Sequence, residues 1–139
     1  MVFLNKLYNM ENTNLSGKKI LIVEDDLSSR LYLNKILEKT GAVLFNASDG
    51  KEALGIALSD ADVDIILMDI QLPVMDGYTC AKKIREVRKE IKIIAQTAYT
   101  MSGDIENIIS SGFDDYLIKP IYSITLIEKL SSLLDDKKD

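Results

Sequence analysis

The sequence contains no histidine and only one cysteine, Cys80. The missing histidine excludes histidine acid–base catalysis and histidine-ligated metal sites. A single cysteine excludes a disulfide framework within the chain and fits a reducing, cytoplasmic compartment. Because Cys80 stands next to Ala81 in a predicted helix, we expect a small buried residue there rather than a reactive thiol.

Long apolar runs and basic stripes are also missing. No run approaches the roughly 20 apolar residues that a membrane-spanning helix needs, so we expect no membrane insertion. The formal net charge is −5 and the lysines are scattered, which argues against direct nucleic-acid binding. With 139 residues, of which 47% are hydrophobic and 28% charged, the chain has the length and composition of one globular domain.

The first 17 residues are rich in asparagine and lack a clear period. We interpret residues 1–17 as an N-terminal tail or linker and residues 18–139 as the folded domain. A docked or continuing helix with Leu4, Leu7 and Tyr8 on one face is the alternative for the first segment.

From Lys18 onward, short apolar runs alternate with amphipathic stretches. The predicted strands span residues 20–23, 42–45, 63–68, 91–95 and 116–118. The predicted helices are residues 27–39, a stretch from an Asp49 cap through Ala57, a stretch containing Cys80 to Val87, a short helix capped by Ser102 that continues to Ile109, and residues 123–134.

Continuous apolar strands predict a parallel sheet that is covered on both faces. Repeated β–α alternation predicts a doubly wound (βα)5 α/β fold of the flavodoxin-like type. In such a five-stranded sheet, with strand order 2-1-3-4-5, strands one, three, four and five are neighbours. Their carboxyl ends meet at the edge where these folds place their functional sites.

Charged and polar residues collect at these predicted strand ends. Any one of them has an ordinary explanation, such as an acid that caps the next helix. Together they are more specific, because crowded carboxylates repel without a cation, oxygen ligands suit Mg²⁺ and a lysine supplies charge for phosphate. The residues at the strand ends are Glu24, Asp25 and Asp26 after the first strand, Asp69 at the end of the third, Thr97 after the fourth, and Lys119 with Pro120 after the fifth.

Four segments, in this order and spacing, resemble the response-regulator receiver family of two-component systems. The resemblance covers roughly residues 18–134, and the sequence around Asp69 is similar to that of receivers attached to hybrid histidine kinases. The segments are Ile20-Leu-Ile-Val-Glu-Asp-Asp, Ile66-Leu-Met-Asp-Ile-Gln-Leu-Pro-Val-Met-Asp-Gly, Gln96-Thr-Ala and Asp115-Tyr-Leu-Ile-Lys-Pro.

The resemblance implies that Asp69 is the phosphorylation site and attacks a phosphohistidine of a partner. It also implies that Lys119 and Thr97 bind phosphoryl oxygens, that Thr97 and Tyr116 form a switch, and that the bond before Pro120 is a cis peptide. The implied Mg²⁺ ligands are Glu24, acting largely through water, Asp25, Asp69 and the backbone carbonyl of Gln71. Asp26 is expected to point outward.

The implied partners are a histidine kinase or histidine phosphotransfer protein upstream, and a protein target or attached kinase module downstream. The expected location is cytoplasmic, with a tether to a membrane sensor kinase if the domain belongs to a hybrid kinase. The domain would be modified and change its surface at residues 102–109, 116–118 and 123–134, and it would not be a turnover enzyme by itself.

Three other functions fit an α/β domain of this kind. A haloacid-dehalogenase-like phosphatase would have its nucleophile in an Asp-x-Asp motif after the first strand, where this chain has adjacent acids. A flavodoxin-like electron carrier would have a Ser/Thr/Gly-rich phosphate loop there, and acids would repel the cofactor phosphate. A pseudo-receiver that is never phosphorylated and acts as a protein interaction module is the alternative we retain.

Overall fold

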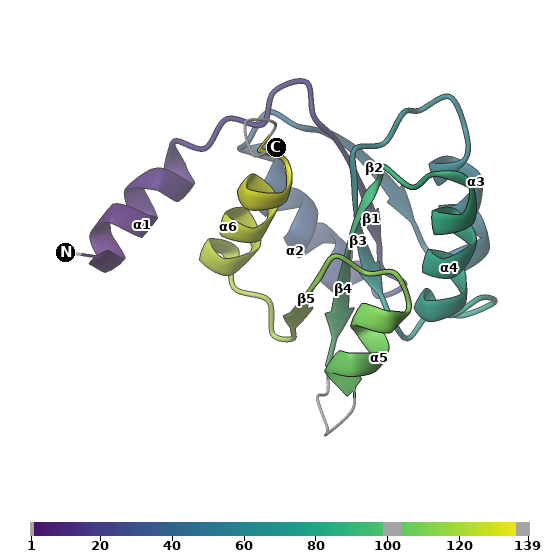
Figure 1. The fold of residues 1–139 in the computed structure, drawn as a ribbon. Coiled ribbons are helices and arrows are strands. Elements are labelled where there is room, and N and C mark those ends of the chain that lie inside the picture. Colours follow the sequence, from purple (N-terminus) through teal and green to yellow (C-terminus); the bar gives the residue numbers. More distant parts are fainter. Residues whose placement is uncertain (1, 99–103, 136–139) are drawn as a thin grey trace.

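The structure is a computed structural model that describes residues 2–98 and 104–135. Its centre is a five-stranded parallel sheet in the order β2-β1-β3-β4-β5 (Figure 1), which confirms the predicted fold and strand order. The strands are β1 (Lys19–Val23), β2 (Val43–Ala47), β3 (Ile65–Asp69), β4 (Lys92–Thr97) and β5 (Asp115–Ile118). The helices are α1 (Val2–Glu11), α2 (Leu27–Glu38), α3 (Gly50–Ala57), α4 (Gly77–Val87), α5 (Asp104–Ser110) and α6 (Ser123–Leu133).

Helices cover both faces of the sheet. Helices α2 and α6 pack on one face, and α3, α4 and α5 pack on the other (Figure 1). Successive strand residues point to opposite faces, so Ile94 joins the core under α2 and α6 whereas Ile93 and Ala95 join the core on the other side. Every residue of β3 is buried, which explains why this strand is a continuous apolar run that ends in an acid.

Aspartate side chains fix the start of three helices. Each accepts a hydrogen bond from the backbone N–H three residues later, an N-cap that typically stabilises a helix by about 1 kcal/mol. The caps at α2 and α4 lie in the loops that follow β1 and β3, so they hold those loops close to the strand ends. The capping pairs are Asp26 with Ser29, Asp49 with Glu52, and Asp76 with Thr79.

The N-terminal segment differs from a featureless tail. Residues Val2–Glu11 form α1, the helix that we weighed as the alternative, and this helix contacts α6. Within the described residues, no helix is long and apolar enough to cross a membrane. The chain enters β1 and leaves α6 at the same edge of the sheet, opposite the carboxyl ends of the strands (Figure 1).

Element boundaries shift slightly from the sequence-based expectation. β2 runs to Ala47 rather than residue 45, because this edge strand carries polar and exposed residues that weaken its apolar pattern. The expected cap Ser102 lies outside the described residues, and α5 is described from Asp104.

Candidate functional site

The carboxyl ends of four neighbouring strands meet at one edge of the sheet. The register places Gln96 of β4 beside Asp69, the last residue of β3. Glu24 directly follows β1, Thr97 ends β4, and Lys119 directly follows β5. The fold therefore places at one edge of the sheet residues that are up to 95 positions apart in the sequence.

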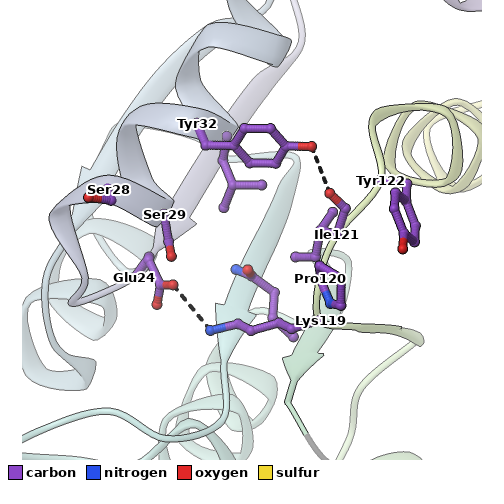
Figure 2. Close-up of a pocket in the computed structure, with 10 residues that line it drawn as sticks. Glu24, Ser28, Ser29, Tyr32, Lys119, Pro120, Ile121 and Tyr122 are labelled. Atoms are coloured by element: carbon purple, nitrogen blue, oxygen red, sulfur yellow. Dashed lines mark hydrogen bonds and ion pairs between the residues drawn. The ribbon is translucent and has the colours of Figure 1, made fainter.

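Lys119 joins the acids of two strand ends. Its Nζ lies 2.7 Å from Oδ2 of Asp69 and 3.1 Å from Oε1 of Glu24, and Figure 2 shows the contact with Glu24. The two carboxylate side chains are only 9% and 1% exposed, respectively. Because a buried charge is costly unless it is paired, the ammonium group stabilises both carboxylates at this position.

The pKa values of Glu24 and Lys119 are both raised, although burial acts on the two groups in opposite directions. Burial, reinforced by the hydrogen bond and negative charge of Asp69, raises the pKa of Glu24 to about 7, although Lys119 opposes the shift. Burial alone would lower the pKa of Lys119, but the hydrogen bond and charge of Asp69, followed by those of Glu24, outweigh burial and raise it. The lysine therefore stays charged, while Glu24 gains a proton readily when no other cation is present.

The three acids form a cluster with the donor set of a hard divalent cation. Glu24, Asp25 and Asp69 each offer a carboxylate oxygen, and these oxygens lie within 4.8 Å of one another. Oε2 of Glu24 is buried and, among the described residues, has no hydrogen-bond partner. An all-oxygen set with an unpaired buried carboxylate oxygen fits a cation such as Mg²⁺.

The backbone around the acids is fixed by local contacts. The Gln71 N–H donates to Oδ1 of Asp69 at 2.9 Å, and the Arg30 guanidinium donates to the Glu24 carbonyl at 2.9 Å. At Gly77, an added Cβ would lie 2.5 Å from the backbone oxygen of Asp69. Glycine is therefore needed here, because it lets α4 begin against the end of β3.

The three acids after β1 have different environments. Glu24 is buried, whereas Asp25 and Asp26 are exposed. Asp26 points away from the cluster into an N-cap, and its hydrogen bonds with the backbone and hydroxyl of Ser29 lower its pKa. Asp26 therefore lies outside the group of acids formed by Glu24, Asp25 and Asp69.

Thr97 and Tyr116 occupy neighbouring strands on the side of Lys119. The Lys119 N–H donates to the Thr97 carbonyl at 2.7 Å, and the peptide bond between Lys119 and Pro120 is cis. Thr97 and Tyr116 are both half-buried. The Nζ of Lys129 lies 5.1 Å from the centre of the Tyr116 ring, a cation–π contact that holds the ring at the β5–α6 surface.

Sequence reasoning quoted Gln96 within one of the family segments but gave this polar residue no role at the edge of the sheet. Gln96 is completely buried, and it lines a pocket of about 380 Å³ together with Glu24, Tyr32 and Lys119. Its only signal in the sequence was an amide at the end of an otherwise apolar strand. That signal is weak, because the strand pattern does not show which face the side chain takes.

An α/β sheet with acids and a lysine at its carboxyl edge is the arrangement expected of a two-component receiver. The family model described as response regulator receiver domain matches residues 20–131. The chain belongs to this family.

Known proteins and structures agree with this assignment. The chain is 37% identical over 131 residues to hybrid signal transduction histidine kinase I of Dictyostelium discoideum. This alignment covers 88% of the present chain and 8% of the kinase. It is 36% identical over 121 residues to the polar-differentiation response regulator DivK of Brucella ovis. That alignment covers 86% of the present chain and 98% of DivK. It therefore spans a small part of the kinase and nearly all of the response regulator.

A solved structure shows the same fold. The crystal structure of the receiver domain of a sensor histidine kinase from Pseudomonas aeruginosa PAO1 matches with a TM-score of 0.78 at 35% identity, over 85% of this chain and 98% of that one. That structure is described with a magnesium ion coordinated in its active-site cleft.

Proposed function

We propose that this receiver accepts a phosphoryl group on Asp69 and serves as a switch in a two-component phosphorelay. The observation that carries the proposal is the position of Asp69, whose carboxylate ends a buried strand and pairs with the Lys119 ammonium beside Glu24. An Asp69 oxygen attacks the phosphorus of a partner's phosphohistidine, and an O–P bond forms as the N–P bond breaks. The bonding electrons leave with the imidazole, which takes up a proton.

Mg²⁺ is the cation that we assign to the acidic cluster. Its ligands would be Asp25, Asp69 and the backbone carbonyl of Gln71, with Glu24 acting through water. When bound, the ion neutralises charge on the phosphoryl oxygens. Support comes from the unpaired, buried Oε2 of Glu24 and from the excess of acids over lysine at this edge.

Lys119 and Thr97 would hold the transferred group. Lys119 already contacts Asp69, so its ammonium lies where a phosphoryl oxygen on Asp69 gains a charge-assisted hydrogen bond. Thr97 ends the adjacent strand β4, and its hydroxyl would donate to a second phosphoryl oxygen. This chain's own residues thereby orient the group for in-line transfer.

The surface beside the site fits a helical partner, which we take to be a histidine kinase or a histidine phosphotransfer protein. Leu27 and Leu31 of α2 are 58% and 60% exposed, and Tyr122 of the β5–α6 loop is 68% exposed. The Tyr32 hydroxyl donates to the Ile121 carbonyl at 2.8 Å, which ties α2 to that loop (Figure 2). Exposed apolar side chains next to a reactive group are typical of docking surfaces.

The output of the switch would be a change at α5, β5 and α6. A phosphoryl group adds negative charge and acceptor oxygens next to Thr97. If Thr97 moves toward them, Tyr116 gains space behind β4, and the surface read by a protein target or an attached kinase module changes. In this role the domain is a substrate and switch rather than a turnover enzyme.

Phosphorylation from a small donor tests the proposal directly. The protein is incubated with acetyl phosphate and Mg²⁺, the acyl phosphate is trapped with borohydride, and the modified residue is mapped by mass spectrometry. We expect the label on Asp69 and no label in Asp69→Asn. Asp26→Asn is the matched control and should be labelled like the wild type, because asparagine also caps helices well.

The same experiment separates the receiver from a pseudo-receiver. Labelling of Asp69→Asn at the wild-type rate would show that the acceptor lies elsewhere. No labelling of the wild type by acetyl phosphate or by a phosphorylated histidine kinase would leave the interaction module as the function.

A further inference from the structure

The pocket lined by Gln96, Glu24, Tyr32 and Lys119 lies next to the acidic cluster, on the face of the sheet covered by α2 and α6. It has a volume of about 380 Å³, within the usual range of small-molecule sites, about 300–1,000 Å³. Figure 2 shows it between α2 and the loop that follows β5. Its apolar wall consists of Leu33, Pro120 and Ile121.

Gln96 lines this pocket and has a buried side-chain amide without hydrogen-bond partners in the part of the chain that the structure describes. The residue is 0% exposed, and neither Nε2 nor Oε1 has a hydrogen-bond partner among the described residues. A buried primary amide without partners is costly, and native proteins normally pair such groups. The unpaired amide therefore indicates a missing donor and a missing acceptor at one place.

No polar group of the described residues, those lining the pocket included, forms a hydrogen bond with this amide. The Tyr32 hydroxyl is used by the Ile121 carbonyl, and the Ser29 hydroxyl is used by Asp26. Lys119 is shared by two carboxylates. These contacts leave the amide of Gln96 to an outside molecule.

We propose that this pocket binds a small, neutral, planar molecule that carries an N–H donor beside a carbonyl acceptor, as a lactam or a carboxamide does. Such an edge pairs with the amide of Gln96 through two antiparallel hydrogen bonds. An anion is disfavoured because Glu24 and Asp69 outnumber Lys119, and a cation without an acceptor would leave Nε2 unpaired. Pairing requires rotation of the Gln96 amide toward the pocket, and this terminal torsion is soft in glutamine.

The ligand would sit beside the phosphorylation site without replacing any part of it. Glu24 and Lys119 line the pocket and also belong to the acidic site. Gln96 itself is adjacent to Thr97 in β4. Binding can nevertheless be tested on the unmodified protein, because the amide of Gln96 is present without phosphorylation.

Amide NMR of the full chain with 2-piperidone, a six-membered lactam, tests the proposal. We expect saturable shifts of the Gln96 side-chain NH₂ and of the backbone amides of Tyr32 and Ile121. N-methyl-2-piperidone has nearly the same shape but no N–H donor, and we expect it to bind at least about tenfold more weakly, one good hydrogen bond by the usual conversion. Gln96→Leu should lose binding by a similar factor.

Three controls make the result decisive. Gln96→Leu must give a dispersed, folded spectrum, and Gln96→Met serves if it does not. Asn107→Leu alters an exposed amide on α5 and should bind the lactam like the wild type. Equal shifts with the two lactams, or no saturable shift at Gln96, would overturn the proposal and assign the amide's partner to a buried water.

Discussion

At the scale of single residues, Glu24 is held by two opposing effects. Burial and its neighbour Asp69 favour the protonated form, whereas Lys119 favours the charged form, and burial wins. The outcome is a carboxyl group that opposes folding when it is ionised and no metal is bound.

The first prediction concerns the pH dependence of stability without metal. The folded-state pKa of Glu24, about 7, lies above its ordinary value of 4.5, so its contribution is fully present below about pH 4.5 and is lost as the pH rises through 7. In EDTA, urea unfolding should give a free energy lower at pH 8 than at pH 5 by on the order of 2 kcal/mol. Glu24→Gln should flatten this slope, and an unchanged slope in the variant would contradict the assignment.

The second prediction concerns Val74 in the β3–α4 loop. This exposed valine has a φ of +70°, a left-handed conformation that costs an L-residue about 1–2 kcal/mol. Val74→Gly should therefore raise the free energy of unfolding by about 0.5–1 kcal/mol after the entropic cost of glycine.

Val43 provides the matched control for that substitution. It is an exposed valine in β2, where glycine weakens the strand, so Val43→Gly should lower stability by about 1 kcal/mol. Chemical denaturation measures both variants. Destabilisation by both would show that the loop gains nothing from glycine at position 74.

Residue-level prediction from sequence succeeded where several strand ends agreed and failed for a single side chain. The acids, Thr97 and Lys119 could be named because each follows a recognisable apolar strand. Gln96 could not, because its environment depends on which helix covers its face of the sheet. The pairing of Lys119 with both Asp69 and Glu24 likewise depends on side-chain placement, which no spacing rule provides.

At the scale of elements, one arginine links parts of the fold that lie on either side of β4. The Arg85 guanidinium on α4 donates to the carbonyls of Gly112, Lys89 and Ile91, and it pairs with Asp114 at 2.9 Å. It thereby fixes the loop before β5 and the entry to β4. The planar guanidinium suits these several acceptors at once.

The third prediction is that the planar guanidinium of Arg85 is needed to hold the loop before β5 and the entry to β4. Arg85→Lys keeps the charge but cannot reach all the acceptors, so we expect a loss of about 2 kcal/mol in the free energy of unfolding. Arg88→Lys is the control: Arg88 has one exposed backbone acceptor, the Ser59 carbonyl at 3.1 Å, and its ion pairs with Asp62 and Glu90 are long, at 3.6 and 3.9 Å. It should change stability by less than about 0.5 kcal/mol, and equal effects would refute the special role of Arg85.

Element prediction followed the strength of the local signals. The helix at Asp49 was predictable because an aspartate cap precedes an apolar face, and β3 was predictable because it is fully buried. The end of β2 was less certain because an edge strand is half exposed. Helix α1 was only an alternative, since its asparagine-rich sequence has a weak period and the helix gains support from contact with α6.

At the scale of the whole molecule, the proposed Mg²⁺ site would link metal binding to folding. The fourth prediction is that Mg²⁺ raises the melting temperature, because the acids of the cluster repel less when a cation is bound. At a Mg²⁺ concentration about 100 times its Kd, the gain is about 2.7 kcal/mol, or roughly 5–10 °C for a domain of this size.

Two substitutions localise that effect. Asp25→Asn should reduce the thermal gain, whereas Asp60→Asn, in the turn after α3 at the other edge of the sheet, should leave it unchanged. Differential scanning fluorimetry across a Mg²⁺ titration measures both. A melting temperature of the wild type that does not respond to Mg²⁺ would count against the metal site.

The fifth prediction concerns the spread of the signal. Beryllofluoride, a phosphoryl mimic, should shift amide resonances at Asp69 and also across residues 104–124. Thr97→Val keeps the shape of the side chain but removes the hydroxyl, so it should keep the shifts near Asp69 and reduce those in α5 and β5. The expected coupling is about 1–3 kcal/mol, and shifts confined to the Asp69 pocket would restrict phosphorylation to a local effect.

The edge at which the chain enters β1 and leaves α6 has a consequence for how this domain can be built into larger assemblies. The entry into β1 and the exit from α6 both lie at the opposite edge of the sheet from the acidic cluster (Figure 1). A module joined to the domain through these connections would therefore lie on the side away from the acidic cluster. Asp69, the proposed phosphoryl acceptor, would then stay open to phosphodonors on the same chain or on another.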